Sequence, residues 1–197
     1  MLIYLHGFNS SPASHKAQLL KRFLEECGMG DQYRCPELPH LPRRAIAVIE
    51  AEIAKHPRAS ITLIGSSLGG FYSTYLAERY DLPSVLINPA VHPHQGLRAY
   101  LGTQRNLFTQ QQYQFTEDHL RQWEQLYLPN IRPQRYLLLV ETGDEVLDYR
   151  EAVKKYHGAR QIVIEGGDHS LASFPEHLPL IMEFSRSAAT GPRPKQS

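Results

Sequence analysis

The segment "IGSSLGG", residues 64–70, places Ser67 between two glycines at the point where an apolar run gives way to a stretch of helical period. In a Gly-x-Ser-x-Gly turn the serine takes a strained backbone conformation, so the residues two positions to either side must lack bulk. Gly65 and Gly69 meet that requirement. Ser67 is therefore a candidate nucleophile. The competing interpretation is that these glycines only permit close packing of a strand on a helix.

A nucleophilic serine needs a general base, and that base needs an acid that holds it in the correct tautomer. The predicted base is His169, which lies in "GGDHS", a glycine-rich loop just after the last apolar run. Asp144 is the preferred acid, because Asp148, followed by Glu151, has the pattern of a helix N-cap. Asp148 is the alternative. Four carboxylates compete in "ETGDEVLD": Glu141, Asp144, Glu145 and Asp148.

The loop after the first apolar run, "LHGFNSS", supplies backbone donors. Gly7 permits a sharp turn that lets the Phe8 N–H point into the same cleft as the N–H of Leu68, which follows the nucleophile. Phe8 and Leu68 are therefore the predicted oxyanion donors. His6 is interpreted as a structural residue of the turn.

Substrate contacts are less well defined by the pattern. Phe8 and Phe71, together with aromatic residues of 92–133, could form an apolar acyl pocket. Asn88 follows the fourth apolar run, although a turn accounts for "NPA" almost as well. Ordinary core packing is the alternative interpretation of the aromatic residues. The candidate substrate-binding residues are Phe8, Asn9, Phe71 and Asn88.

Short apolar runs alternate with segments of helical period, which is the pattern of βαβ units around a parallel sheet. The predicted strands are residues 2–5, 33–35, 61–64, 85–87, 136–140 and 161–164. Helical periodicity is clearest at 20–27, 46–53 and 68–76. Ser11 and Pro12 are expected to cap and open the first helix. Because sites of such sheets lie beyond the carboxyl ends of the strands, the nucleophile, base and acid should meet at one edge.

A single domain is expected over residues 1–185, since a chain of 197 residues suffices for one good core. Residues 92–133 show no strand pattern and contain a predicted helix around 116–127. So long an excursion predicts a helical, lid-like insertion after the fourth strand. The alternative is an insertion packed on the body without a substrate role. Residues 186–197 are small, polar and Pro-containing, and are expected to form a disordered tail.

Composition argues against several classes of protein. The formal net charge is +1 and Lys and Arg are scattered, which disfavours nucleic acid or an anionic membrane as partner. No run approaches the roughly 20 apolar residues of a membrane span. The opening "MLIYLHG" does not resemble a signal peptide, so a cytoplasmic protein is expected. Cys27 and Cys35 have no metal-binding spacing with His, and both are interpreted as buried thiols.

Taken in order, the motifs "YLHGFNSSP", "GSSLGG", "LINPA", "TGDEVLD" and "GGDHS" make the chain resemble the α/β-hydrolases, and more narrowly the small YqiA-type esterase family. The similarity covers all but the tail. It implies a three-layer α/β sandwich with strand order 2-1-3-4-5-6. It also implies a triad of Ser67, Asp144 and His169, with Phe8 and Leu68 as oxyanion donors and no cofactor or metal. The antiparallel strands that precede the His-Gly turn in the larger superfamily are missing here.

Three functions are open on this basis. The first is a serine hydrolase that cleaves carboxylic esters of short or medium acyl chains through an acyl-enzyme. The second is an acyl thioesterase or acyltransferase that uses the same triad. For both, the expected partner is a small-molecule acyl ester or thioester. The third is a non-catalytic binding protein on a hydrolase fold.

Overall fold

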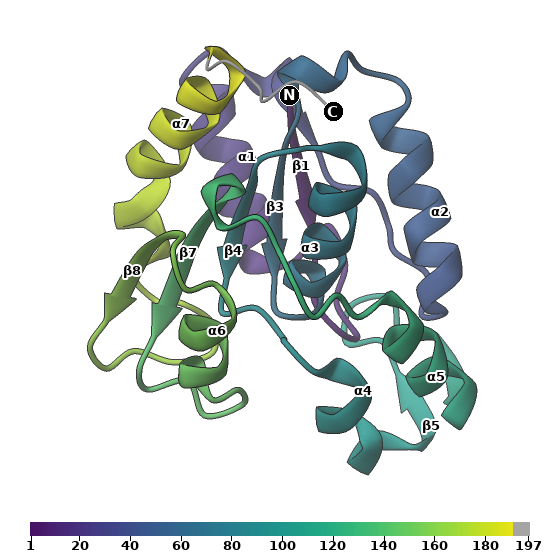
Figure 1. Ribbon diagram of the computed structural model, residues 1–197. Helices are drawn as coiled ribbons and strands as arrows, with labels where there is room; N and C mark the ends of the chain where they lie inside the picture. Colours follow the sequence, from purple (N-terminus) through teal and green to yellow (C-terminus); the bar gives the residue numbers. More distant parts are fainter. Residues whose placement is uncertain (191–197) are drawn as a thin grey trace.

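The computed structural model describes residues 1–190, with side chains through residue 187. A six-stranded sheet in the order β2-β1-β3-β4-β7-β8 forms its centre (Figure 1). Each neighbouring pair of strands in this sheet is parallel. The predicted parallel sheet and its order 2-1-3-4-5-6 are therefore confirmed. The strands are β1 (Leu2–Leu5), β2 (Tyr33–Arg34), β3 (Thr62–Ser66), β4 (Ser84–Ile87), β7 (Tyr136–Glu141) and β8 (Arg160–Ile164).

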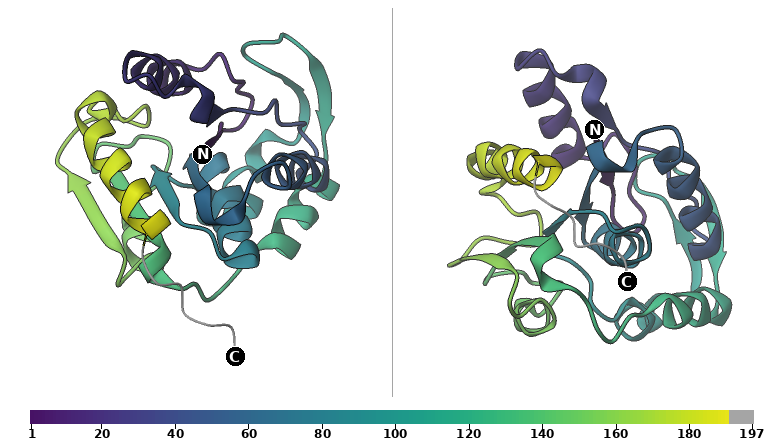
Figure 2. Two further views of the ribbon diagram at one scale, coloured as in Figure 1. Left: turned by 90° about the horizontal axis from the view of Figure 1, so that it is seen from above. Right: turned by 45° about the horizontal axis from the view of Figure 1, so that its top comes forward.

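Helices cover both faces of the sheet, which confirms the three layers. The helices are α1 (His15–Glu26), α2 (Pro42–Ile53), α3 (Leu68–Tyr80), α6 (Tyr149–Lys155) and α7 (Phe174–Thr190). Figures 1 and 2 show α1 and α7 on one side and α2 and α3 on the other. Successive residues of a strand point to opposite faces, so Ile3 and Leu5 pack with α2, α3 and α6, whereas Leu2 and Tyr4 pack with α1 and α7. Burial on both faces explains why these strands are continuous apolar runs.

An insertion between β4 and β7 lies beyond the carboxyl ends of the strands (Figure 1). It comprises α4 (Pro93–Gly96), β5 (Gly102–Arg105), β6 (Gln112–Phe115) and α5 (Glu117–Leu126). β5 and β6 form an antiparallel hairpin, so the expectation of a segment without strands is wrong. The strand sequence "GTQR" is polar and mostly exposed. In "QYQF" polar and apolar residues alternate over only four residues, at the lower limit of the roughly 4–8 residues from which a strand is recognised. The helix expected around 116–127 is present.

Two predicted boundaries are wrong. α1 begins at His15, because residues 11–14 form a turn in which the Ser11 carbonyl accepts from the Ser14 N–H. α7 continues to Thr190, into the segment expected to be a disordered tail. The helix packs on the sheet through Ile181 and Phe184, and the first helix breaker after it is Gly191. The rest of the predicted tail, residues 191–197, lies outside the described residues.

The cysteines also differ from the prediction, since Cys27 is exposed and Cys35 only partly buried. Cys27 is the C-cap residue of α1, directly after the last helical residue. Within residues 1–190, no helix is both long and apolar enough to cross a membrane.

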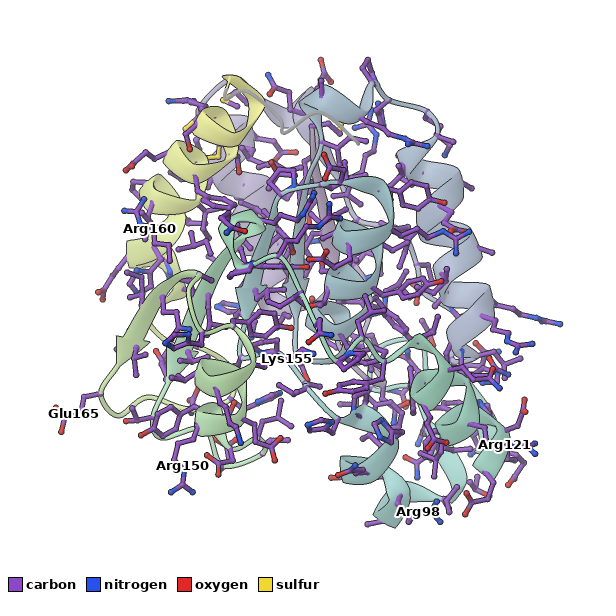
Figure 3. All side chains as sticks on the ribbon, viewed as in Figure 1. Arg98, Arg121, Arg150, Lys155, Arg160 and Glu165 are labelled. Carbon is purple, nitrogen blue, oxygen red and sulfur yellow. The ribbon has the colours of Figure 1, made fainter. Side chains whose placement is uncertain are left out.

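Many exposed charged side chains are paired with neighbours of opposite charge. Arg98 pairs with Glu117, and Arg121 with Asp118, both on the insertion (Figure 3). Exposed pairs of this kind contribute about 0–1 kcal/mol each. The stability of the fold therefore rests mainly on the two apolar layers of the core.

Candidate active site

Ser67 occupies the turn between β3 and α3 with φ 54° and ψ −121°. A positive φ is strained for a residue with a side chain, and such strain is typical of functional sites. A Cβ on Gly65 would overlap the carbonyl of Gly69, and one on Gly69 would overlap the carbonyl of Leu5. The steric requirement read from the sequence is therefore met, and the serine hydroxyl is held at the carboxyl edge of the sheet.

Ser67, His169 and Asp144 form a chain of hydrogen bonds. Ser67 Oγ lies 3.1 Å from His169 Nε2, and His169 Nδ1 lies 2.9 Å from each Asp144 oxygen. The carboxylate accepts from the Nδ1–H, which leaves Nε2 as the acceptor that faces the serine hydroxyl. This arrangement allows the imidazole to take the serine proton as the hydroxyl attacks.

The Asp144 side chain is only 1% exposed and is satisfied by several donors. Besides His169, it accepts from the N–H groups of Val146 and Leu147 at 2.9 and 2.8 Å. Burial raises the pKa of Asp144, but these hydrogen bonds outweigh burial and hold the pKa below its ordinary value. The carboxylate is therefore ionised at neutral pH, as the partner of an imidazolium must be.

Asp148, the alternative acid, has a different environment. Its side chain accepts from the N–H of Arg150 at 3.0 Å and so caps α6. It also pairs with the Arg150 guanidinium at 2.8 Å. The N-cap pattern in the sequence is thus realised, and the structure brings Asp144 rather than Asp148 to the imidazole.

Phe8 and Leu68, the predicted oxyanion donors, line the same cavity as Ser67. A Cβ on Gly7 would lie 3.3 Å from Ser67 Cβ, so residue 7 approaches the serine closely because it has no side chain. Within residues 1–190, no acceptor faces the N–H of Phe8. Leu68 is the first residue of α3, and its N–H has no intrahelical acceptor. Their role as oxyanion donors stays a prediction, and the N-terminus of α3 is a position that favours negative charge.

His6 is buried beneath this loop and does not face Ser67 as a base. Its Nε2 accepts from the N–H of Leu38 at 3.1 Å, so its protonated Nδ1 donates to the Gly7 carbonyl at 3.1 Å. Burial lowers the pKa of His6 more than the Gly7 hydrogen bond raises it. The neutral ring therefore connects the loop at Gly7 to Leu38 through two hydrogen bonds, which agrees with the structural role expected for it.

A cavity of about 660 Å³ opens beside Ser67 and His169. Its size falls within the range of roughly 300–1,000 Å³ that is typical of small-molecule sites. Its larger apolar and aromatic lining residues are Tyr4, Phe8, Leu68, Val91, Leu97, Tyr100, Leu107, Phe108, Val146 and Leu147. Most come from the insertion and from the loop after β7. Phe8 and aromatic residues of the insertion were expected in such a pocket. The sequence analysis missed Leu107, Val146 and Leu147, although apolar residues in the otherwise polar stretches "NLFT" and "DEVLD" were a usable signal.

Of the four predicted substrate contacts, only Phe8 lines this cavity. Asn9 instead lines a neighbouring cavity of about 280 Å³. Phe71 is 5% exposed and belongs to the core, and Asn88 is 2% exposed. The structure does not bring Asn9, Phe71 or Asn88 to the cavity beside the serine. Among the described residues 1–190, no three His, Cys, Asp or Glu side chains are grouped to hold a metal ion.

Asn88 and Glu141 together support the loop that carries His169. Asn88 Nδ2 donates to the carbonyls of Asp168 and His169 at 3.1 and 3.2 Å, and its Oδ1 accepts from the Glu141 N–H at 3.0 Å. Glu141, only 1% exposed, accepts from the N–H groups of Asp168 and Ser173 at 2.8 and 3.1 Å. It also accepts from the Ser173 hydroxyl at 2.6 Å. The Asn88 amide is thus committed to the backbone that orients the imidazole.

Replacing Glu141 by Gln should lower the free energy of unfolding by about 1–3 kcal/mol at pH 7, because an NH₂ group would then face buried N–H donors. Burial raises the pKa of Glu141, but its hydrogen bonds outweigh burial and lower it below 4.5. The stabilisation by the ionised group is therefore fully present above pH 4.5 and is lost as the pH falls through the lower folded-state pKa. Urea unfolding at pH 7 and at steps below pH 4.5 measures this.

The exposed Glu165, at the end of β8 (Figure 3), offers a matched control. Glu165→Gln should leave the free energy of unfolding unchanged at every pH. A difference between wild type and Glu141→Gln that stays constant from pH 7 to the most acidic step would contradict the prediction.

Comparison with known protein families shows to which family the chain belongs. A family model described as "Uncharacterised protein family (UPF0227)" matches residues 1–186. The chain belongs to the UPF0227 family. A "UPF0227 protein" of Citrobacter koseri is 23% identical over 193 residues, which cover 93% of this chain and 98% of the relative.

Solved structures identify the fold of this UPF0227 protein. A putative hydrolase from Agrobacterium vitis superposes with a TM-score of 0.75 at 16% identity, covering 93% of this chain and 87% of the other. The mouse "Alpha/beta hydrolase domain-containing protein 10" gives 0.74 at 15% identity, covering 94% and 89%. The UPF0227 protein thus has the α/β-hydrolase fold, and the resemblance read from the motifs is confirmed at the level of fold and family.

Proposed function

We propose that this UPF0227 protein is a serine hydrolase that cleaves carboxylic esters of short or medium acyl chains. The observation that carries the proposal is the hydrogen-bonded chain from Ser67 Oγ through His169 to the buried Asp144, beside an apolar cavity. The hydrolases among the proteins of similar fold support it at the level of fold.

In this mechanism His169 Nε2 removes the hydroxyl proton as Ser67 Oγ attacks the acyl carbonyl carbon. The N–H groups of Phe8 and Leu68 stabilise the negative charge that develops on the carbonyl oxygen. Asp144 stabilises the imidazolium. His169 then gives its proton to the departing alcohol, which leaves an acyl group on Ser67. Water, activated by the same imidazole, releases the carboxylic acid and restores the serine.

The cavity favours an acyl group over a polar or extended substrate. Burying alkyl carbons against its apolar lining stabilises the bound substrate by about 0.8 kcal/mol per CH₂. Val146 and Leu107 are 56% and 71% exposed, so the apolar surface continues to the mouth of the cavity. A thioesterase or acyltransferase would use the same residues and differs only in the leaving group or acceptor.

Wild-type protein should be labelled by a fluorophosphonate probe, with the added mass on the peptide that contains Ser67. It should also hydrolyse p-nitrophenyl esters, with kcat/KM rising from acetate to hexanoate as more carbons are buried. Matched oxygen and sulfur esters, with and without an added alcohol acceptor, separate the esterase from the thioesterase and acyltransferase. Absence of both labelling and turnover would contradict the proposal and favour a binding protein.

A further inference from the structure

The β5–β6 hairpin of the insertion is tied to residues 9 and 10 by four hydrogen bonds. The Tyr113 hydroxyl donates to Asn9 Oδ1 at 2.7 Å, and Asn9 Nδ2 donates to Gln104 Oε1 at 3.2 Å. The Leu107 N–H donates to the Asn9 carbonyl at 2.9 Å. Asn106 Nδ2 donates to the carbonyl of residue 10 at 2.8 Å. Elements about 100 residues apart in the chain are thus joined next to the Phe8 N–H.

Asn9 has a conformation that needs such support. Its φ of 51° lies in the left-handed region, which asparagine tolerates better than most residues. Both polar atoms of its side-chain amide are hydrogen-bonded to the hairpin, Oδ1 to Tyr113 and Nδ2 to Gln104. Asn9 therefore acts as an anchor between the hairpin and the loop. Asn9 directly follows Phe8, so its anchoring restrains the chain on the C-terminal side of Phe8, while the Gly7 carbonyl, in the same peptide plane as the Phe8 N–H, is bonded to His6 Nδ1.

The Phe8 ring is held by the same insertion. It packs edge-on against Tyr100, Phe115 and Trp123, with ring centroids 5.9, 5.6 and 6.5 Å away. Trp123 Nε1 in turn donates to the Tyr72 hydroxyl of α3 at 2.9 Å. The residue that offers the candidate oxyanion donor is therefore fixed through both its side chain and its successor.

The insertion is itself bound to the body at several points. Figure 2 shows it beside α2, on the side away from α7. At its far end Lys155 of α6 donates to the carbonyls of Leu128 and Pro129, and its ammonium lies 4.6 Å from the centre of the Tyr127 ring (Figure 3). These contacts attach the insertion to the body of the domain, so that it can hold the loop after β1 in place.

Tyr113 is held by its own neighbours. Its ring stacks on His40 with centroids 4.2 Å apart. His40 Nδ1 is hydrogen-bonded at 2.8 Å to His119 Nε2, and His119 Nδ1 accepts from the Thr116 N–H. Burial raises the pKa of Tyr113 to about 12, so its hydroxyl remains a donor throughout the working pH range. The hydroxyl is thus a fixed and permanent donor to Asn9.

We propose that Tyr113 is a positioning residue for the hydrolytic reaction: it holds Asn9, and through Asn9 it aims the Phe8 N–H at the oxyanion. This inference rests on the proposed function. It assigns Asn9 to the support of the oxyanion loop rather than to substrate contact. It also gives the insertion a role in the chemical step that a mobile cover over the cavity would not have.

Tyr113→Phe removes only the hydroxyl and tests the inference. Loss of an entire oxyanion donor costs about 10²- to 10³-fold in rate, so a misaligned donor should cost less, about tenfold in kcat. KM should change less than twofold, because the apolar cavity is untouched. The affinity for a trifluoromethyl ketone, which forms an oxyanion at the serine, should fall by the same factor as kcat. Gln104→Met, which removes the other bond to the Asn9 amide, should act in the same direction.

Thr103→Val is the matched control. It removes the bond from Gln114 Nε2 to Thr103 Oγ1 on the same hairpin without touching the loop, so kcat and ketone affinity should equal those of wild type. If wild type turns over esters and Tyr113→Phe matches Thr103→Val, the positioning role is overturned while the proposed function stands. If wild type neither hydrolyses esters nor takes the probe, both are overturned. Thermal unfolding of each variant separates a loss of folding from a loss of alignment.

Discussion

Ser67→Ala should lower kcat by about 10⁶-fold, the size of the loss seen when the serine of a well-studied triad is removed. The reason is that the Oγ atom forms the covalent bond to the acyl group, and no other hydroxyl lies within hydrogen-bonding distance of His169 Nε2 among the described residues 1–190. Alanine adopts the strained turn at about the same cost as serine, so folding should be preserved. Steady-state hydrolysis of a p-nitrophenyl ester and circular dichroism measure the two effects.

Ser60→Ala provides a serine control at the opposite end of β3. Ser60 is exposed and donates to the Pro57 carbonyl, far from the cavity. This variant should retain wild-type turnover and fluorophosphonate labelling, whereas Ser67→Ala should lose both. Hydrolysis by Ser67→Ala within tenfold of wild type would exclude Ser67 as the nucleophile and, with it, the acyl-enzyme.

Asp144→Asn should lower kcat by about 10⁴-fold while the fold is retained. The Asp144 oxygen bonded to the N–H groups of Val146 and Leu147 can remain an acceptor in the variant. The new NH₂ group then faces His169 Nδ1, which must become the acceptor. The proton moves to Nε2, and the imidazole can no longer take the proton of Ser67. A fall of this size, with an unchanged unfolding midpoint, would identify a tautomer effect.

Asp148→Asn distinguishes the two acids that the sequence left in competition. Asparagine caps a helix as well as aspartate does, so α6 should keep its N-terminus. The Asp148 side chain is 41% exposed and pairs with Arg150, and its loss as a charge should change kcat only a few-fold. If Asp148→Asn caused the larger loss, the acid would have to be reassigned.

The parallel sheet could be read from the sequence because its strands are buried on both faces. Runs such as "LIYL" and "LLLV" are then apolar without alternation, and they stand out between helical segments. The turn at Ser67 was equally visible, since glycine at both 65 and 69 of a strand-to-helix junction is what a strained serine turn requires. Local sequence and global fold agree at these elements.

The hairpin and the helix boundaries could not be read in the same way. β5 and β6 are mostly polar and exposed, and their pairing depends on the hydrogen bonds that tie Asn106 to its own turn and to the loop after β1. Nor could the roles of Asn88 and Phe71 be separated from the pattern. Both residues lie in the sequence near positions where a binding residue is expected. Asn88, however, is bonded to the backbone of the loop that carries His169, and Phe71 is packed in the core.

By itself the sequence determined the order of the elements, the strained turn at Ser67 and a short set of residues with the chemistry of a hydrolase. The tertiary structure alone decided that Ser67 Oγ and His169 Nε2 lie 3.1 Å apart, that Asp144 rather than Asp148 faces the ring, and that the Asn9 side chain is bonded to the hairpin. Periodicity and turn chemistry act between neighbours in the chain. Contacts between residues 25 to 104 positions apart depend on how loops settle against one another once the core has packed.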